Sequence, residues 1–150
     1  MICCDQFSST HILQVIAWNK KKKKPCIYQV GNNPGKIRSP EEYIIPHIQT
    51  EKVDVFSMCN IFYSLLTKER PWDSYTNEIA KERIKKGHRP HIDEDLKNSD
   101  NSIVKVFLIA MDKCFITNPK ERARASEILK FFNVALANID DPNYIPKWKR

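Results

Sequence analysis

Apolar residues recur at helical spacing through most of the chain beyond residue 50. Residues 103–115 and 125–137 each place apolar side chains three or four positions apart, which is the spacing of one face of an α-helix. Residues 76–86 form a third candidate helix, because Gly87 follows directly and glycine favours the left-handed conformation that ends many helices. The pattern therefore predicts a mainly α fold.

The segment 51–68 differs from these helices because apolar residues occupy nearly every side of it. A helix that is apolar all round is typical of the buried centre of a domain. Polar residues at Asp54, Ser57 and Asn60 interrupt the run too often for a membrane span. We therefore expect about five helices around a buried central helix, with Asp54 as a buried acid that needs hydrogen-bond donors.

The first third of the chain carries weaker patterns. Residues 1–19 have no clear period, and the run Lys20–Lys24 is typical of a solvated loop. Gly, Asn and Pro residues predict a loop over 31–40. Ser39 followed by Pro40 suits the start of a short helix that ends near residue 45.

These patterns divide the chain into three parts. Residues 1–30 are a poorly defined segment with the lysine run, residues 31–138 are a folded domain, and residues 139–150 are an extended surface tail. The formal net charge of +7 favours acidic partners without choosing among nucleic acid, anionic membranes and acidic peptides.

The numbers and spacing of the cysteines and glycines limit the kinds of metal and nucleotide site that the chain can form. The five cysteines include no closely spaced ligand pair of the kind that zinc needs, so we expect reduced thiols, no metal site, and a cytoplasmic or nuclear location. No signal peptide or membrane span is recognisable, and we expect no membrane partner. Only three glycines occur, Gly31, Gly35 and Gly87, and their spacing matches neither a dinucleotide fingerprint nor a P-loop.

Four motifs occur in a characteristic order. They are PGKIRSPEEY at 34–43, KVDVFSMCNIFYSLLTKERPW at 52–72, ERIKKGHRPHID at 82–93 and MDKCFITNPKERARASEIL at 111–129. Together they resemble the C-terminal lobe of a eukaryotic protein kinase catalytic domain, from the end of the activation segment to the last helix. Ser39-Pro40-Glu41 stands where that family carries Ala-Pro-Glu. The resemblance implies that this chain has the fold of the lower part of a kinase C-lobe.

The resemblance also assigns roles to particular residues. It implies a buried ion pair between Glu41 and Arg122, which in the family ties the activation segment to the lower lobe. It implies that Asp54 accepts backbone N–H groups of the catalytic loop. It further implies that Pro34, Gly35, Lys36, Ile37 and Arg38 form the loop that positions the main chain of a protein substrate.

The parts of a kinase that hold nucleotide and perform catalysis have no counterpart in the sequence. There is no Gly-rich loop, no Val-Ala-x-Lys, no His-Arg-Asp and no Asp-Phe-Gly. We therefore expect no catalytic, nucleotide-binding or metal-binding residues in this chain, whereas ATP and Mg²⁺ serve the complete family domain. The face of the central helix that the missing parts cover in the family is expected to be an exposed apolar patch.

Three functions remain open. The chain is expected to be a truncated, catalytically inactive kinase remnant or pseudokinase that binds a protein. Alternatively, it is part of a longer, active Ser/Thr or Tyr protein kinase. A third alternative is a basic, all-α adaptor that uses Lys20–Lys24 and the tail on protein or nucleic acid. A protein substrate or partner is preferred over nucleic acid, and the sequence indicates no oligomeric state.

Overall fold

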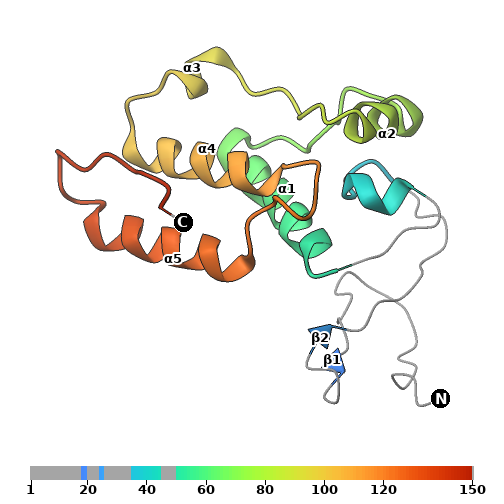
Figure 1. Ribbon diagram of the computed structural model, residues 1–150. Coiled ribbons are helices and arrows are strands. Elements are labelled where there is room, and N and C mark those ends of the chain that lie inside the picture. Colours follow the sequence, from blue (N-terminus) through green and yellow to red (C-terminus); the bar gives the residue numbers. More distant parts are fainter. Residues whose placement is uncertain (1–17, 20–23, 26–34, 45–49, 150) are drawn as a thin grey trace.

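The computed structural model describes residues 18–19, 24–25, 35–44 and 50–149, and its fold is mainly α (Figure 1). In chain order the elements are β1 (Trp18–Asn19), β2 (Lys24–Pro25), the 3-10 helix η1 (Pro40–Tyr43), α1 (Lys52–Thr67), α2 (Asn77–Lys85), α3 (Glu94–Lys97), α4 (Ser102–Cys114) and α5 (Ala125–Asn138). The prediction of a mainly α fold with about five helices is confirmed for the described residues. Within these residues, no helix has the length and apolar character needed to cross a bilayer.

The strands β1 and β2 form a two-residue antiparallel pair, with Trp18 opposite Pro25 and Asn19 opposite Lys24. Lys24 therefore belongs to a strand pair, whereas we predicted a solvated loop. The remainder of the lysine run and the other predictions for residues 1–17 and 26–34 lie outside the described residues.

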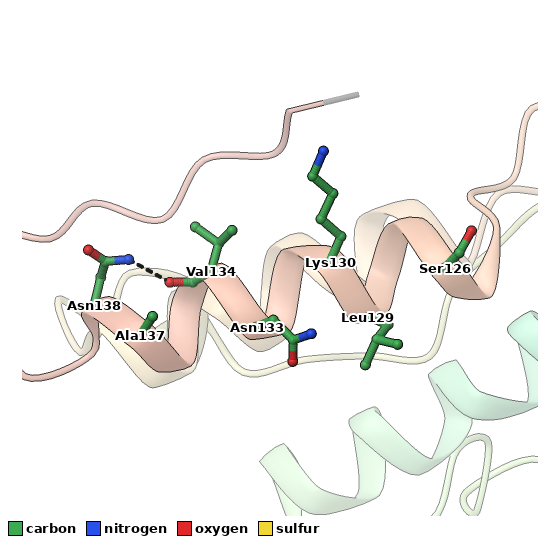
Figure 2. Close-up of a pocket in the computed structure, with 7 residues that line it drawn as sticks. All are labelled: Ser126, Leu129, Lys130, Asn133, Val134, Ala137 and Asn138. Atoms are coloured by element: carbon green, nitrogen blue, oxygen red, sulfur yellow. Dashed lines mark hydrogen bonds between the residues drawn. The ribbon is translucent and has the colours of Figure 1, made fainter.

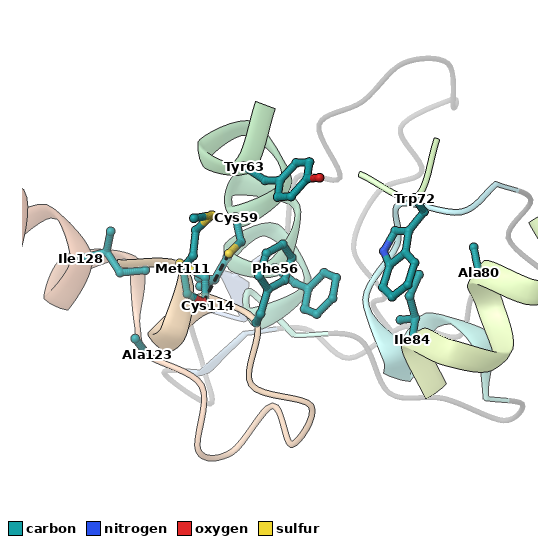
Figure 3. Packing of buried hydrophobic residues seen from close by; sticks show 12 residues of the cluster. Phe56, Cys59, Tyr63, Trp72, Ala80, Ile84, Met111, Cys114, Ala123 and Ile128 are labelled. Atoms are coloured by element: carbon teal, nitrogen blue, oxygen red, sulfur yellow. Dashed lines mark hydrogen bonds between the residues drawn. The ribbon is translucent and has the colours of Figure 1, made fainter. Parts of the chain in front are cut away.

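The main core lies between α1 and α4 and extends towards α2 (Figure 3). Phe56 of α1 meets Phe115, the residue after α4, edge to face, with ring centroids 5.1 Å apart. Burial of one such ring contributes about 1.5–3 kcal/mol. Cys59 and Cys114 are fully buried in this core as free thiols, and burial is the main cause that raises the pKa of the Cys59 thiol.

A second apolar cluster joins α4 to α5. Its buried members are Val106, Ala110, Phe131 and Ala135, and Trp148 from the tail packs against it. The rings of Phe131 and Trp148 lie 5.2 Å apart. The tail is an extended segment at the surface, and part of it covers this cluster. The physical reason is that its aromatic side chains bury more apolar surface there than they would in solvent.

The central helix α1 is buried on most of its surface but exposed along one face, which corrects the prediction that it has neighbours all round. Ile61 and Leu65 are 59% and 64% exposed, and Asp54 and Ser57 on the same side are exposed as well. These positions lie three or four residues apart and so share one face of the helix. The described residues pack against the other faces, so this exposed face of α1 is the apolar patch that the sequence led us to expect.

Capping residues set the ends of α2. Thr76 begins the helix, and its hydroxyl accepts a hydrogen bond from the Ile79 N–H at 3.4 Å. Gly87 follows the helix with a φ of +81°, in the left-handed region that glycine adopts without strain. Both features agree with the predicted boundaries of this helix.

Candidate functional site

The candidate site is the segment 35–44, which carries the Gly35–Arg38 part of the predicted substrate-positioning loop, followed by η1 (Figure 1). Pro34 of that loop lies outside the described residues. The segment contacts α2 through η1 and is tied to α1 and to residues near the start of α5 by side-chain hydrogen bonds. We call these ten residues the anchored segment.

An ion pair between Glu41 and Arg122 joins the anchored segment to the loop before α5. The two guanidinium nitrogens donate to the two carboxylate oxygens at 2.7 and 2.9 Å, so the pair is bidentate. The Arg122 side chain is 0% exposed and that of Glu41 is 12% exposed. The contact that we expected between these residues, 81 positions apart in the chain, is therefore present.

The remaining N–H donors of the Arg122 guanidinium are also hydrogen-bonded, to backbone carbonyl oxygens. Arg122 donates to the carbonyl oxygens of Lys52 at 2.6 Å, Ile116 at 2.8 Å and Thr117 at 3.3 Å. Its guanidinium lies 5.0 Å from the centre of the Phe56 ring. A buried cation needs such complete pairing, because an unpaired charge in the interior is strongly destabilising. Arg122 thus connects the anchored segment, the start of α1 and the turn after α4.

Glu42 is a buried acid that the sequence analysis did not single out. Its carboxylate accepts hydrogen bonds from the Ser39 N–H at 2.8 Å and the Ser39 hydroxyl at 2.9 Å. It also pairs with Arg38 at 3.2 Å. The signal was available, because serine followed three residues later by glutamate is the capping-box pattern. The box fixes the start of η1, which in turn directs Glu41 towards Arg122.

Tyr43 holds the loop part of the anchored segment against η1. Its hydroxyl donates to the Gly35 carbonyl at 2.8 Å and accepts from the Arg38 N–H at 3.2 Å. Burial, the largest cause, raises the pKa of this phenol. Tyr43 therefore keeps its proton at neutral pH and can serve as donor and acceptor at once.

Two further contacts fasten the loop to neighbouring elements. The Lys36 ammonium donates to the carbonyl oxygens of Tyr75 at 2.8 Å and Asp73 at 3.1 Å, in the loop between α1 and α2. Asn60 of α1 donates its side-chain amide to the Ile37 carbonyl at 2.7 Å. The anchored segment is thereby held from three sides.

The anchored segment presents two apolar side chains to solvent. Ile37 is 52% exposed and Ile44 is 54% exposed, although the backbone around them is tied down. Lys81 of α2 lies close by, with its ammonium 5.5 Å from the centre of the Tyr43 ring. A rigid backbone with exposed apolar side chains is suited to contact with another protein, because little conformational entropy is lost on binding.

Asp54 does not occupy the buried position that we predicted. It lies on the exposed face of α1 and accepts no hydrogen bond from any described residue. The reason is geometric, since position 54 falls on the same face as Ile61 and Leu65, away from α4. Residual desolvation, with smaller contributions from Glu42 and Glu51, raises the pKa of the Asp54 carboxyl.

A surface hollow on α5 is separate from this site (Figure 2). It is shallow and is lined by Ser126, Leu129, Lys130, Asn133, Val134, Ala137 and Asn138, all from one helix. The Asn138 side chain donates to the Val134 carbonyl at 2.7 Å. Lys130 is the one charged residue in this lining, so the hollow offers no acid–base pair. Within the described part of the chain, no cluster of three or more His, Cys, Asp or Glu residues could hold a metal ion.

Comparisons with known proteins point to kinases. The chain is 28% identical to the RGS domain-containing serine/threonine-protein kinase A of Dictyostelium discoideum. This alignment spans 82 residues and covers 55% of this chain. The chain is 27% identical to the probable serine/threonine-protein kinase roco11 of the same organism, in an alignment of 130 positions that covers 79% of this chain. A further probable serine/threonine-protein kinase of that organism is 29% identical over 108 residues, 71% of this chain.

These matches support a distant, kinase-like relationship. The chain spans only 7%, 8% and 11% of the lengths of the three relatives. No protein-family profile matches the chain. The similarity therefore relates the chain to protein kinases without assigning it an activity.

Proposed function

We propose that this chain is the lower, non-catalytic part of a kinase-like domain and that its anchored segment serves as a rigid binding surface for another protein. The observation that carries the proposal is the bidentate Glu41–Arg122 pair, which holds the segment to the helical core. The distant similarity to serine/threonine kinases supports the same origin. On this proposal a protein partner meets Ile37 and Ile44, and the chain by itself neither binds ATP nor transfers phosphate.

The sequence supports the non-catalytic part of the proposal. Phosphoryl transfer needs groups that cradle the phosphates, bind Mg²⁺ and orient the attacking hydroxyl. The chain contains none of the motifs that supply these groups in protein kinases. Thus ATP and Mg²⁺ belong, in this proposal, to other parts of a complete kinase domain.

A thermal-shift measurement with ATP and Mg²⁺ tests the non-catalytic character. A ligand at 100 times its dissociation constant stabilises the folded state by about 2.7 kcal/mol. We expect no change in melting temperature when ATP and Mg²⁺ are raised into the millimolar range, and the same result with ADP as control. A saturable, Mg²⁺-dependent rise in melting temperature would contradict the proposal.

A second function is favoured by the lengths of the relatives. Because the chain spans at most 11% of each of them, it is also consistent with a segment of a longer, active serine/threonine kinase. Sequencing the transcript upstream of the Met1 codon distinguishes the two functions. An open reading frame with His-Arg-Asp and Asp-Phe-Gly motifs would favour the active kinase, and its absence would favour the non-catalytic module.

A further inference from the structure

The C-terminal tail alternates between buried and exposed side chains. Pro146 is buried and Tyr144 and Trp148 are half-buried, whereas Ile145 is 68% exposed and Lys147 and Lys149 are exposed. This two-residue period is that of an extended chain with one face against a surface. The tail turns back after α5 and runs along α5 beside α4 (Figure 1).

The surface beneath the tail is an apolar cluster formed by α4 and α5. We call the part of this surface that the tail covers the groove. Val106, Ala110, Phe131 and Ala135 form its buried floor, and both aromatic residues of the tail pack against them. The Trp148 ring lies 5.2 Å from that of Phe131 at an interplanar angle of 49°. At the other end, the Ser102 hydroxyl donates to the Tyr144 carbonyl at 3.4 Å.

The tail is fastened firmly at one end only. The turn after α5 is closed by hydrogen bonds from the Asp141 N–H to Asn138 and from the Tyr144 N–H to Asp141, at 3.1 and 3.0 Å. Beyond Tyr144, residues 145–149 make no hydrogen bond or ion pair with any described residue. Side-chain burial alone holds that part, and segments held in this way open more readily than the helices beneath them.

We propose that residues 144–148 are a displaceable strap over a binding groove for extended peptides. The groove accepts an aromatic residue, a proline and a second aromatic residue at alternate positions, and the chain's own Tyr144, Pro146 and Trp148 are its resident occupants. When the strap leaves, a segment of the same chemistry from another protein takes its place. This inference is independent of the proposed function, because the groove contains no residue of the anchored segment.

A peptide-binding experiment on the full-length chain tests the strap. The probe is a synthetic peptide of residues 142–150 with a fluorophore at its N-terminus, titrated with the chain and followed by fluorescence anisotropy. The wild-type chain is compared with Trp148→Ala, which weakens the strap, and with Ile145→Ala, a matched control whose side chain points to solvent. Circular dichroism of each variant reports whether the helices remain folded.

The strap competes with the peptide, so removing its tryptophan should free the groove. Because apparent affinity scales with the fraction of open groove, we expect Trp148→Ala to bind the peptide roughly 10-fold more tightly than wild type. Ile145→Ala should bind like wild type, and a peptide in which Trp148 is replaced by Ala should not bind any chain.

Three outcomes would overturn the proposal. One is equal peptide affinity for wild type and Trp148→Ala, and another is no measurable binding to Trp148→Ala while its helices remain folded. The third is loss of helical structure in both Trp148→Ala and the milder variant Tyr144→Ala. In that case the tail is an integral part of the fold and not a displaceable strap.

Discussion

At the scale of single residues, Arg122 contributes more to the fold than its partner Glu41. The guanidinium bonds three carbonyl oxygens besides the carboxylate, so its removal leaves several buried acceptors and a buried charge unpaired. Replacing Glu41 removes only the carboxylate contacts. For the same reason a charge-reversed pair is a poor test, because a glutamate at 122 would face these carbonyl oxygens.

A double-mutant cycle measures the coupling directly. We expect Arg122→Met to lower the free energy of unfolding by about 3–5 kcal/mol and Glu41→Gln by about 1–3 kcal/mol. The coupling energy from the cycle should be about 1–3 kcal/mol in urea unfolding. A coupling near zero would show that the pair contributes nothing beyond the separate contacts of each residue.

We expect Asp54 to make the free energy of unfolding depend on pH. Its pKa in the folded state is raised above the ordinary value of 3.8, so between these two pKa values the folded state binds more protons than the unfolded state. Stability of the wild type therefore falls as pH rises through this window. We expect Asp54→Asn to be more stable relative to wild type at pH 7 than at pH 3, as measured by urea unfolding at both values.

Asp54→Leu tests the same position without a polar group. Since the carboxylate accepts no hydrogen bond from described residues, we expect this change to be neutral or stabilising at pH 7. A loss of stability above about 2 kcal/mol would mean that the Asp54 carboxylate does accept hydrogen bonds, because its removal would leave their donors unsatisfied.

At the scale of elements, the turn after α2 depends on close approach to the turn after α4. Gly87 has a φ of +81°, and a Cβ added there would lie 2.7 Å from the Thr117 hydroxyl oxygen. Gly35 has a φ of +99°, but an added Cβ would meet nothing within 4 Å. Substitutions at these two glycines therefore distinguish the cost of backbone strain, which both share, from the cost of a steric clash, which only Gly87 has.

Alanine at each glycine checks this difference. We expect Gly35→Ala to cost about 1 kcal/mol from backbone strain alone, and Gly87→Ala to cost about 2–3 kcal/mol because the clash adds to the strain. Thermal unfolding of both variants measures the costs. Adding Thr117→Ala to Gly87→Ala should recover the difference, and failure to do so would rule out the clash as its cause.

At the scale of the whole molecule, we expect the exposed face of α1 to be a surface of self-association. Ile61 and Leu65 present apolar area to solvent from the longest helix of the described fold. Exposed apolar patches of this kind favour self-association. The outer side of α5 also exposes Leu129 and Leu136. The α1 face and the α5 face are therefore two alternative surfaces through which copies of the chain could associate.

Paired substitutions identify which surface associates. We expect Ile61→Gln with Leu65→Gln to lower self-association in sedimentation velocity by about 10-fold, with little change in melting temperature because both side chains are already exposed. Leu129→Gln with Leu136→Gln serves as the matched control on α5. If only the α5 pair lowers association, the assignment to α1 is wrong.

The sequence by itself determined the helices α1, α2, α4 and α5 to within about two residues. Helical period, capping at Thr76 and the glycine after α2 are local properties, so they can be read without knowing what packs where. The contact between Glu41 and Arg122 came from resemblance to kinases, since no local pattern links residues 81 positions apart.

Tertiary structure alone decided which surfaces are buried. Asp54 and its neighbours on α1 have the composition of a buried helix, but no described element covers that face. The tail has the composition of a loop, yet Trp148 packs against the apolar cluster formed by the neighbouring helices α4 and α5. Burial depends on which partner each face meets in space, and that information resides in the packing of the whole chain and not in the period of any one segment.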